Sequence, residues 1–216
     1  MNPYLLVLSS PSGGGKTTIA RLLLQARDDC GYSVSATTRP MRPNERDGVD
    51  YHFLSRAEFE RRRAAGQFAE WASYADHLYG TLRSEIDQIQ ASGRHVLLDI
   101  DIEGARQLRV AYPASVHVFI LPPSAAVLAE RLTGRKTETR GVLAQRLERA
   151  AHELGAVGEY DYSVVNEDLY TAVAQVAAIL DAESRRVARQ DDLPAAIDRL
   201  RRDVMAEVER LPPVRV

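Results

Sequence analysis

A glycine-rich stretch near the amino terminus carries the clearest chemical signal in the sequence. Residues 9–18 read Ser-Ser-Pro-Ser-Gly-Gly-Gly-Lys-Thr-Thr and lie between a short apolar run and an apolar-periodic run. A strand, a tight glycine turn and a helix are typical of a phosphate-binding loop, where backbone N–H groups and a helix N-terminus face an anion. We expect Lys16 to reach the β- and γ-phosphates of a nucleotide and the Thr17 hydroxyl to ligate Mg²⁺.

The loop departs from the usual pattern at its first position, where Ser10 stands in place of glycine. Serine carries a Cβ, so a left-handed backbone at Ser10 would cost more than it costs glycine. An ordinary glycine-rich turn before a helix is the alternative interpretation. The Lys-Thr pair and the two flanking elements favour phosphate binding.

Length, composition and charge restrict the class of protein. The 216 residues suit one globular domain, and the net charge of −2 gives no electrostatic argument for nucleic-acid or membrane partners. The sequence has no secretory signal and no apolar run near the ~20 residues that span a bilayer, which predicts a cytoplasmic protein. The single cysteine, Cys30, is interpreted as structural, and the five histidines form no metal-ligand spacing.

Apolar runs alternate with helical periodicities, which predicts an α/β fold with a mostly parallel sheet. Strands are expected at residues 4–10, 32–37, 68–74, 95–101, 115–121 and 162–165. Helices are expected at residues 16–26, 56–65, 83–91, 104–111, 125–132, 142–154, 168 to about 190, and 195–211. Two polar segments, 39–51 and 134–141, interrupt the alternation. They are candidates for ligand-binding loops, with solvated surface loops as the alternative.

An ordered set of short motifs follows the loop and supports a resemblance to a known family. The motifs are Ser35-Ala-Thr-Thr-Arg39-Pro-Met-Arg42-Pro, Gly48-Val-Asp-Tyr51-His-Phe53, Phe68-Ala-Glu70-Trp71, Leu78-Tyr79-Gly80-Thr81, Leu98-Asp99-Ile-Asp101-Ile-Glu-Gly104-Ala and Asp161-Tyr-Ser-Val-Val-Asn166. Together with the loop, this set resembles the guanylate kinases from about residue 4 to residue 190.

The resemblance implies a fold and an activity. The fold would be a P-loop three-layer α/β domain over residues 1–216, with a smaller α+β GMP-binding region at 34–93 and a helical lid at 126–154. The activity would be transfer of the γ-phosphoryl group of ATP to GMP, and also to dGMP, with Mg²⁺, in purine nucleotide metabolism and GTP supply. The oligomeric state is left open.

Several residues would bind the acceptor nucleotide. Arg39 and Arg42 lie in a segment that two prolines keep extended, and paired guanidinium groups suit a phosphate dianion. The resemblance assigns them to the GMP phosphate, with the Tyr51 and Tyr79 hydroxyls. Guanine presents two adjacent donors that the Glu70 carboxylate can accept, which adenine does not offer. By resemblance the acceptor site also holds Ser35, Gly80, Thr81 and Asp101.

The donor side of the site follows from the loop and from the resemblance. ATP would contact Ser12, Gly13, Gly14, Gly15, Lys16, Thr17, Thr18 and Asn166. Catalysis would depend on positioning and charge neutralisation by Lys16, Arg42, Arg131, Arg135 and Arg146. Asp99 would hold Mg²⁺ through water, and Asp101 would face the acceptor, with helix capping as the alternative for either carboxylate. The segment 136–141 departs from the family pattern, so the lid contacts are left open.

Two rival functions fit parts of the same pattern. One is a guanylate-kinase-like module that binds peptides, against which the intact Gly15-Lys16-Thr17 and the arginine-rich lid argue. The other is a related kinase with a different acceptor, such as a sugar phosphate. The set Ser35, Glu70, Tyr79 and Thr81 argues against that acceptor.

Overall fold

The computed structural model describes residues 2–74, 76–133 and 140–211. The chain divides into two compact units, which are described separately. The first is Pro3–Ala178, and the second comprises Asn2 and the described residues from Ile179 onward.

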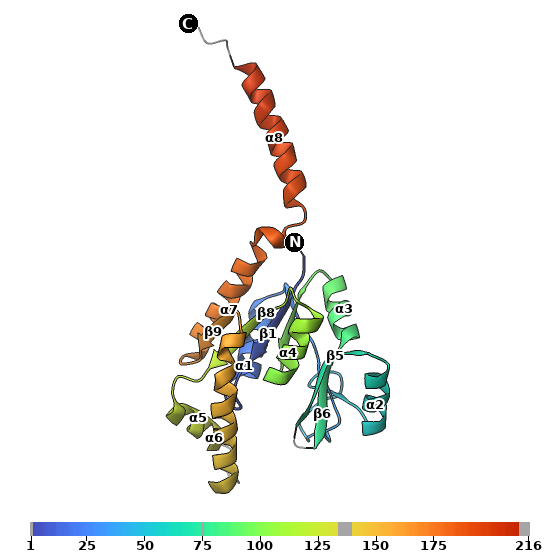
Figure 1. Cartoon of the computed structure of the whole chain (residues 1–216), viewed down its shortest axis with the longest axis vertical. Coiled ribbons are helices and arrows are strands. Elements are labelled where there is room, and N and C mark those ends of the chain that lie inside the picture. Colours follow the sequence, from blue (N-terminus) through green and yellow to red (C-terminus); the bar gives the residue numbers. More distant parts are fainter. Residues whose placement is uncertain (1, 75, 134–139, 212–216) are drawn as a thin grey trace. The chain divides into compact units, whose positions relative to one another are not determined.

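A five-stranded parallel sheet forms the centre of the first unit (Figure 1). Its strands lie in the order β2 (Cys30–Tyr32), β7 (His95–Asp99), β1 (Leu5–Ser9), β8 (Val116–Leu121) and β9 (Tyr162–Val165). Each neighbouring pair is parallel, for example Leu5 beside Val96 and Leu6 beside Val116. The predicted α/β class and mostly parallel sheet are therefore confirmed.

Helices pack on both faces of this sheet, because the side chains of its central strands β7, β1 and β8 are mostly apolar and buried. On one face, Leu5 and Val7 of β1 join side chains of α3 (Arg83–Ala91) and α4 (Ile102–Ala111) in one buried cluster. Since side chains alternate along a strand, Leu6 and Leu8 point to the other face. There α1 (Lys16–Ala26) contacts β1 and β7 and buries Ile19 and Leu23.

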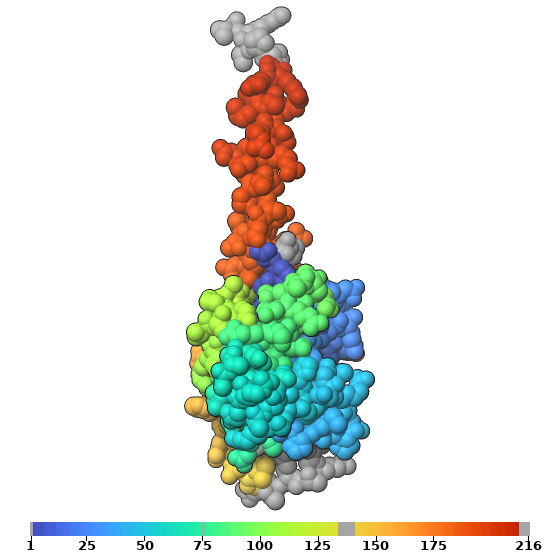
Figure 2. Space-filling model, turned by 90° about the vertical axis from the view of Figure 1, so that its right-hand side faces the viewer, coloured from blue at the N-terminus to red at the C-terminus, as the bar shows by residue number. Residues whose placement is uncertain are grey.

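A second, four-stranded sheet lies between β2 and α3 in sequence. Its order is β4 (His52–Phe53), β3 (Ala36–Thr37), β6 (His77–Leu82) and β5 (Phe68–Tyr74). Helix α2 (Arg56–Ala64) packs Phe59 against Phe68 of this sheet, with ring centroids 4.3 Å apart. Figure 2 shows this part of the chain, coloured blue to teal, as one continuous lobe of the surface.

Two helices flank residues 134–139. The helix before this segment is α5 (Ala125–Thr133), and the helix after it is α6 (Arg140–Leu154), which is followed by a 3₁₀ helix at Gly155–Glu159. Leu128 and Leu132 of α5 pack with Ala150 of α6. Helix α7 (Leu169–Ser184) then follows β9 and continues into the second unit.

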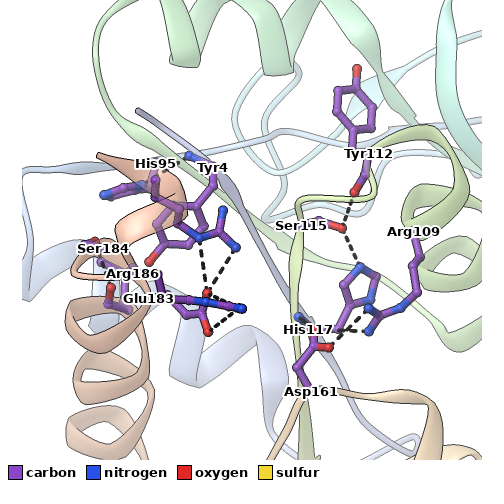
Figure 3. Close-up of polar contacts among 12 residues, drawn as sticks. Tyr4, His95, Arg109, Tyr112, Ser115, His117, Asp161, Glu183, Ser184 and Arg186 are labelled. Atoms are coloured by element: carbon purple, nitrogen blue, oxygen red, sulfur yellow. Dashed lines mark hydrogen bonds and ion pairs between the residues drawn. The ribbon is translucent and has the colours of Figure 1, made fainter. Parts of the chain in front are cut away.

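The second unit contains a 3₁₀ turn at Val187–Arg189 and the helix α8 (Leu193–Arg210). Within this unit, Glu183 accepts a hydrogen bond from Arg186 (Figure 3) and another from Arg189. Helix α8 carries an exposed apolar stripe that includes Ile197, Leu200, Val204 and Val208. In the described parts of the chain, no helix combines the length and the apolar character needed to cross a membrane.

Most predicted elements are present, and four points need correction. The predicted strand 32–37 is two strands, β2 and β3, which belong to different sheets. Strand β6 was not predicted as a strand, and β7 ends at Asp99 rather than at residue 101. The predicted helix from 168 to about 190 ends at Ser184, before the 3₁₀ turn.

Candidate active site

The glycine-rich loop joins β1 to α1 at the carboxyl end of the parallel sheet. Gly13 and Gly15 have φ angles of +83° and +96°, which only glycine adopts at low cost. Gly15 immediately precedes α1, so Lys16 and Thr17 begin the first helical turn. A strand, a left-handed glycine turn and a free helix N-terminus together form an anion-binding site.

The serine at the first loop position fits this geometry. Among the non-glycine residues that the structure describes, only Asp76 has a positive φ, so the strain anticipated at Ser10 does not arise. A Cβ on Gly14 would lie 2.6 Å from the Ser10 Cβ, which explains why residue 14 is glycine. The Ser10 hydroxyl donates to the Pro11 carbonyl at 2.9 Å.

Asn166 contacts the phosphate loop directly. It is 4% exposed and donates from its amide to the Gly14 carbonyl at 3.0 Å. A Cβ on Gly15 would lie 2.4 Å from the same amide nitrogen. This side chain therefore braces the loop's backbone, and its predicted contact with ATP stays a prediction.

Asp99, the last residue of β7, is held by two hydroxyl groups. The Thr17 hydroxyl donates to Oδ2 at 2.5 Å, and the Tyr32 hydroxyl donates to Oδ1. Thr17 and Asp99 are therefore adjacent oxygen donors at the loop, as expected for a pair that would hold Mg²⁺. Burial beside the Asp99 carboxylate raises the pKa of Tyr32 far above its ordinary value, so its hydroxyl stays a donor.

A cavity of about 340 Å³ connects the phosphate loop to the second sheet. Both sheets contribute to its wall, as do the loop and α6. The lining residues are Ser10, Ser12, Lys16, Ser35, Tyr51, Glu70, Ala72, Tyr74, Tyr79, Gly80, Asp99, Ile100, Asp101, Arg149 and Glu153. Nine of the residues predicted from the sequence thus meet in one space: Ser12, Lys16, Ser35, Tyr51, Glu70, Tyr79, Gly80, Asp99 and Asp101.

Glu70 is a buried carboxylate that reaches the cavity from β5 of the second sheet. It is 5% exposed and accepts a hydrogen bond from the Thr81 hydroxyl at 2.6 Å, from the strand position beside it. Burial, aided by the negative charge of Asp101, raises the pKa of Glu70 to about 7. Gly104 leaves room for this carboxylate, because a Cβ there would lie 2.5 Å from Oε2.

Asp101 caps a helix as well as lining the cavity. Its side chain accepts from the Gly104 N–H at 2.8 Å and so begins α4. The predicted strand 95–101 would include Asp101, but β7 ends at Asp99, so Asp101 lies beyond the strand. The capping alternative therefore holds for Asp101, which also faces the cavity.

The two predicted phosphate-binding arginines lie beside the cavity wall, around the carboxylate of Glu45. Arg39 forms an ion pair with Glu45 at 2.7 Å, and its guanidinium lies 5.4 Å from the Tyr51 ring centroid. The Arg42 guanidinium is 3.9 Å from the same carboxylate, and its side chain is 59% exposed. Arg39, Arg42 and Glu45 therefore form one charged cluster next to Tyr51, which lines the cavity.

Two of the arginines predicted for the lid contact residues in or beside the phosphate loop. Arg131 donates from Nη2 to the Asn166 carbonyl at 3.0 Å, while its Nη1 is buried and has no hydrogen-bond partner among the described residues. Arg146 donates from Nη2 to the Ser12 hydroxyl at 3.3 Å. A buried guanidinium nitrogen beside an anion-binding loop is suited to a phosphate oxygen. The third predicted arginine, Arg135, lies outside the described residues.

Four residues of the site were missed by sequence reasoning: Tyr32, Glu45, Arg149 and Glu153. Tyr32 is the last residue of a short strand, and nothing in the sequence around it predicts that its hydroxyl contacts a carboxylate. Glu45 lies two residues after Pro43 in the polar segment 39–51. The spacing of the charged residues in that segment does not predict which of them form ion pairs. Arg149 and Glu153 are four apart on a predicted helix, which is the spacing of an ordinary solvated ion pair.

The fold and the site define a P-loop nucleotide-binding protein of the α/β class, with a phosphate loop at the carboxyl end of a parallel sheet. The family model for guanylate kinase matches residues 2–183. The chain belongs to the guanylate kinase family, and it is a nucleoside monophosphate kinase for which ATP-dependent phosphorylation of GMP is implied.

Individual relatives agree with this assignment. The guanylate kinase of Symbiobacterium thermophilum is 47% identical over 86% of this chain and 88% of its own length. That of Thermotoga maritima is 44% identical over 89% of this chain and 93% of its own. The crystal structure of guanylate kinase from Anaplasma phagocytophilum superposes with a TM-score of 0.75, at 34% identity, and covers 90% of this chain and 93% of that one.

Proposed function

We propose that the cavity binds GMP at its Glu70 end and the phosphates of ATP at its Lys16 end, and transfers the γ-phosphoryl group directly between them. The observation that carries this proposal is the buried Glu70, which accepts from Thr81 and lines the same cavity of about 340 Å³ as Lys16. Guanine's N1–H and N2 amine would donate to Glu70, and adenine would leave the desolvated carboxylate without donors. Acceptance of dGMP is part of the same proposal.

Transfer needs positioning and charge neutralisation rather than covalent help from the protein. An oxygen of the GMP phosphate attacks the γ-phosphorus, and the bond from that phosphorus to the β–γ bridging oxygen breaks as ADP leaves. The loop from Ser12 to Thr18, with Lys16, would hold the donor phosphates. Arg131, Arg135 and Arg146 would neutralise the transferring group.

The acceptor would be held by residues on the other side of the cavity. Arg39 and Arg42 would bind the GMP phosphate, with the Tyr51 and Tyr79 hydroxyls as further donors. Burial raises the pKa of Tyr51, which keeps its hydroxyl protonated for that task. Ser35, Gly80, Thr81 and Asp101 would complete the base and sugar contacts.

Mg²⁺ is the proposed cofactor. The Thr17 hydroxyl and the Asp99 carboxylate are hard oxygen donors 2.5 Å apart, a set that suits this cation, with Asp99 acting through water. Bound there, the ion would neutralise charge on the donor phosphates. A cytoplasmic role in purine nucleotide metabolism and GTP supply, and the division into a GMP-binding region at 34–93 and a lid at 126–154, belong to the same proposal.

The test is ADP release from ATP with GMP, dGMP, AMP, CMP and UMP in separate reactions, with Mg²⁺ or with a chelator. Turnover limited to the two guanine nucleotides, and lost with the chelator, supports the proposal. Turnover with another monophosphate would contradict the role given to Glu70. Turnover with GMP but not with dGMP would contradict only the proposed acceptance of dGMP and leave the rest of the proposal in place.

A further inference from the structure

An arginine of α6 reaches across the cavity to the second sheet. The Arg149 guanidinium lies 4.3 Å from the centroid of the Tyr74 ring, at the end of β5. A guanidinium over an aromatic face at this distance is an attractive cation–π contact. The Tyr74 ring in turn packs edge-on against Tyr79, at 6.5 Å between centroids. Helix α6 is thereby connected to the part of the cavity assigned to the acceptor.

The same arginine is linked to the phosphate loop. Its Nε donates to Oε1 of Glu153 at 2.8 Å, and Oε2 of Glu153 accepts from the backbone N–H of Ser12 at 3.2 Å. Tyr74, Arg149, Glu153 and Ser12 all line the cavity. A continuous series of contacts therefore runs from the acceptor sheet to the loop that binds the donor phosphates.

We propose, on the basis of the proposed function, that Arg149 is a positioning residue that couples the acceptor half of the cavity to the donor half. GMP bound beside Tyr79 would fix the Tyr74 ring and so the Arg149 guanidinium. Arg149 would then fix Glu153 and the Ser12 N–H at the edge of the phosphate loop. Arginine suits this task because its planar fork can stack on a ring while it donates along its edge.

The coupling is a free energy between two sites, so each ligand must change the other's affinity by the same factor. The measurement is calorimetric binding of a non-hydrolysable ATP analogue with Mg²⁺, without GMP and with saturating GMP. In the wild-type protein, GMP tightens binding of the analogue. In Arg149→Ala the tightening falls by about tenfold, while binding of the analogue alone changes by less than about threefold. The effect of the analogue on GMP binding falls by the same factor.

Arg63 provides a matched control. It also lies on a helix, pairs with a glutamate of that helix (Glu60, 2.6 Å) and stacks on an aromatic residue of β5 (Trp71, 4.6 Å to the centroid). Neither Arg63 nor Trp71 lines the cavity. Arg63→Ala therefore leaves the tightening by GMP unchanged. Tyr74→Leu reproduces the loss seen in Arg149→Ala, whereas Tyr74→Phe, which keeps the ring, does not.

Three results would overturn the inference. They are an absence of tightening in the wild-type protein, an unchanged tightening in Arg149→Ala, and an equal loss in Arg63→Ala. A wild-type protein that turns over GMP but gives any of these results retains the proposed function and loses only the role of Arg149. A wild-type protein that does not bind GMP loses both.

Discussion

Replacement of Glu70 by glutamine should stabilise the free protein and weaken GMP binding. The carboxylate is 5% exposed, and its neighbours are the Thr81 hydroxyl, which donates to it, and the negatively charged Asp101. Glutamine has the same shape and keeps an oxygen for the Thr81 hydroxyl. It removes the charge that burial makes costly. The variant therefore separates two effects of the Glu70 carboxylate: it lowers the stability of the free protein, and it strengthens the binding of guanine.

The effect on stability depends on pH in a defined direction. Burial raises the pKa of Glu70 from its ordinary 4.5 to about 7, so the folded state holds this proton more tightly than the unfolded state. The free energy of unfolding of the wild-type protein therefore loses a contribution as pH rises from 4.5 through 7. At about 1.4 kcal/mol for each pKa unit, that loss is roughly 3 kcal/mol at pH 8.5. Glu70→Gln avoids the loss, so it is the more stable protein at pH 8.5 and nearly equal at pH 4.5.

The effect on binding has the opposite sign. Guanine presents two donors, N1–H and the N2 amine, whereas the glutamine side chain has one acceptor oxygen and one NH₂ donor. One of the two guanine donors therefore faces another donor and loses its hydrogen bond. A loss of about 3 kcal/mol, in the range for a hydrogen bond to a charged partner, raises the KM for GMP about a hundredfold and leaves that for ATP unchanged. The wild-type kcat/KM for GMP rises with pH through about 7, and the variant lacks this rise.

Urea unfolding at pH 4.5 and 8.5, with steady-state kinetics over the same range, measures both effects. Glu148→Gln, an exposed substitution on α6, controls for the removal of one carboxylate. A Glu70→Gln protein with wild-type stability at pH 8.5 would refute the buried-charge argument. A wild-type KM for GMP in that variant would refute the base-recognition role.

Three further predictions use other parts of the molecule. Lys16→Ala should lower kcat at least a hundredfold without lowering the unfolding midpoint; near-normal turnover would remove the phosphate-loop assignment. Arg39→Ala should raise the KM for GMP about tenfold or more and leave that for ATP unchanged; unaltered kinetics would make Arg39 a structural partner of Glu45. His117 is 1% exposed and paired with the Ser115 hydroxyl at 2.8 Å (Figure 3). Burial, aided by the positive charge of Arg109, lowers its pKa from 6.5 to about 4. The unfolded state therefore takes up this proton first as pH falls from 6.5 to 4, and stability decreases over that window. His117→Gln should show a smaller decrease in urea unfolding, and an identical one would contradict the assignment.

Sequence reasoning succeeds where local chemistry determines local structure. The loop needs glycines at the left-handed positions 13 and 15. The short apolar run before the loop suits a strand, and the periodic apolar run after it suits a helix. Ser55 caps α2 from the position directly before the helix, and its hydroxyl accepts from the Glu58 N–H at 3.1 Å. These features depend on residues within a few positions of one another.

It fails where the outcome depends on distant parts of the chain. The run at 32–37 reads as a single strand in the sequence, and only the positions of β6 and β7 decide that its two ends join different sheets. The contacts of Arg149 with Tyr74 and of Glu153 with Ser12 join segments more than 70 residues apart. Arg149 and Glu153 are residue types that also occur on solvent-exposed helix surfaces, so no local pattern distinguishes these two cavity residues from ordinary surface residues.

The central claim is that one cavity holds both nucleotides and that the phosphoryl group passes directly between them. The most direct measurement is a single turnover with ATP labelled in its γ-phosphoryl group, at less than one equivalent of the protein and with GMP in excess. The account predicts that the label appears in GDP at the rate at which ADP forms, and that Lys16→Ala abolishes both. Label released as inorganic phosphate, or ADP formation that does not depend on GMP, would contradict it.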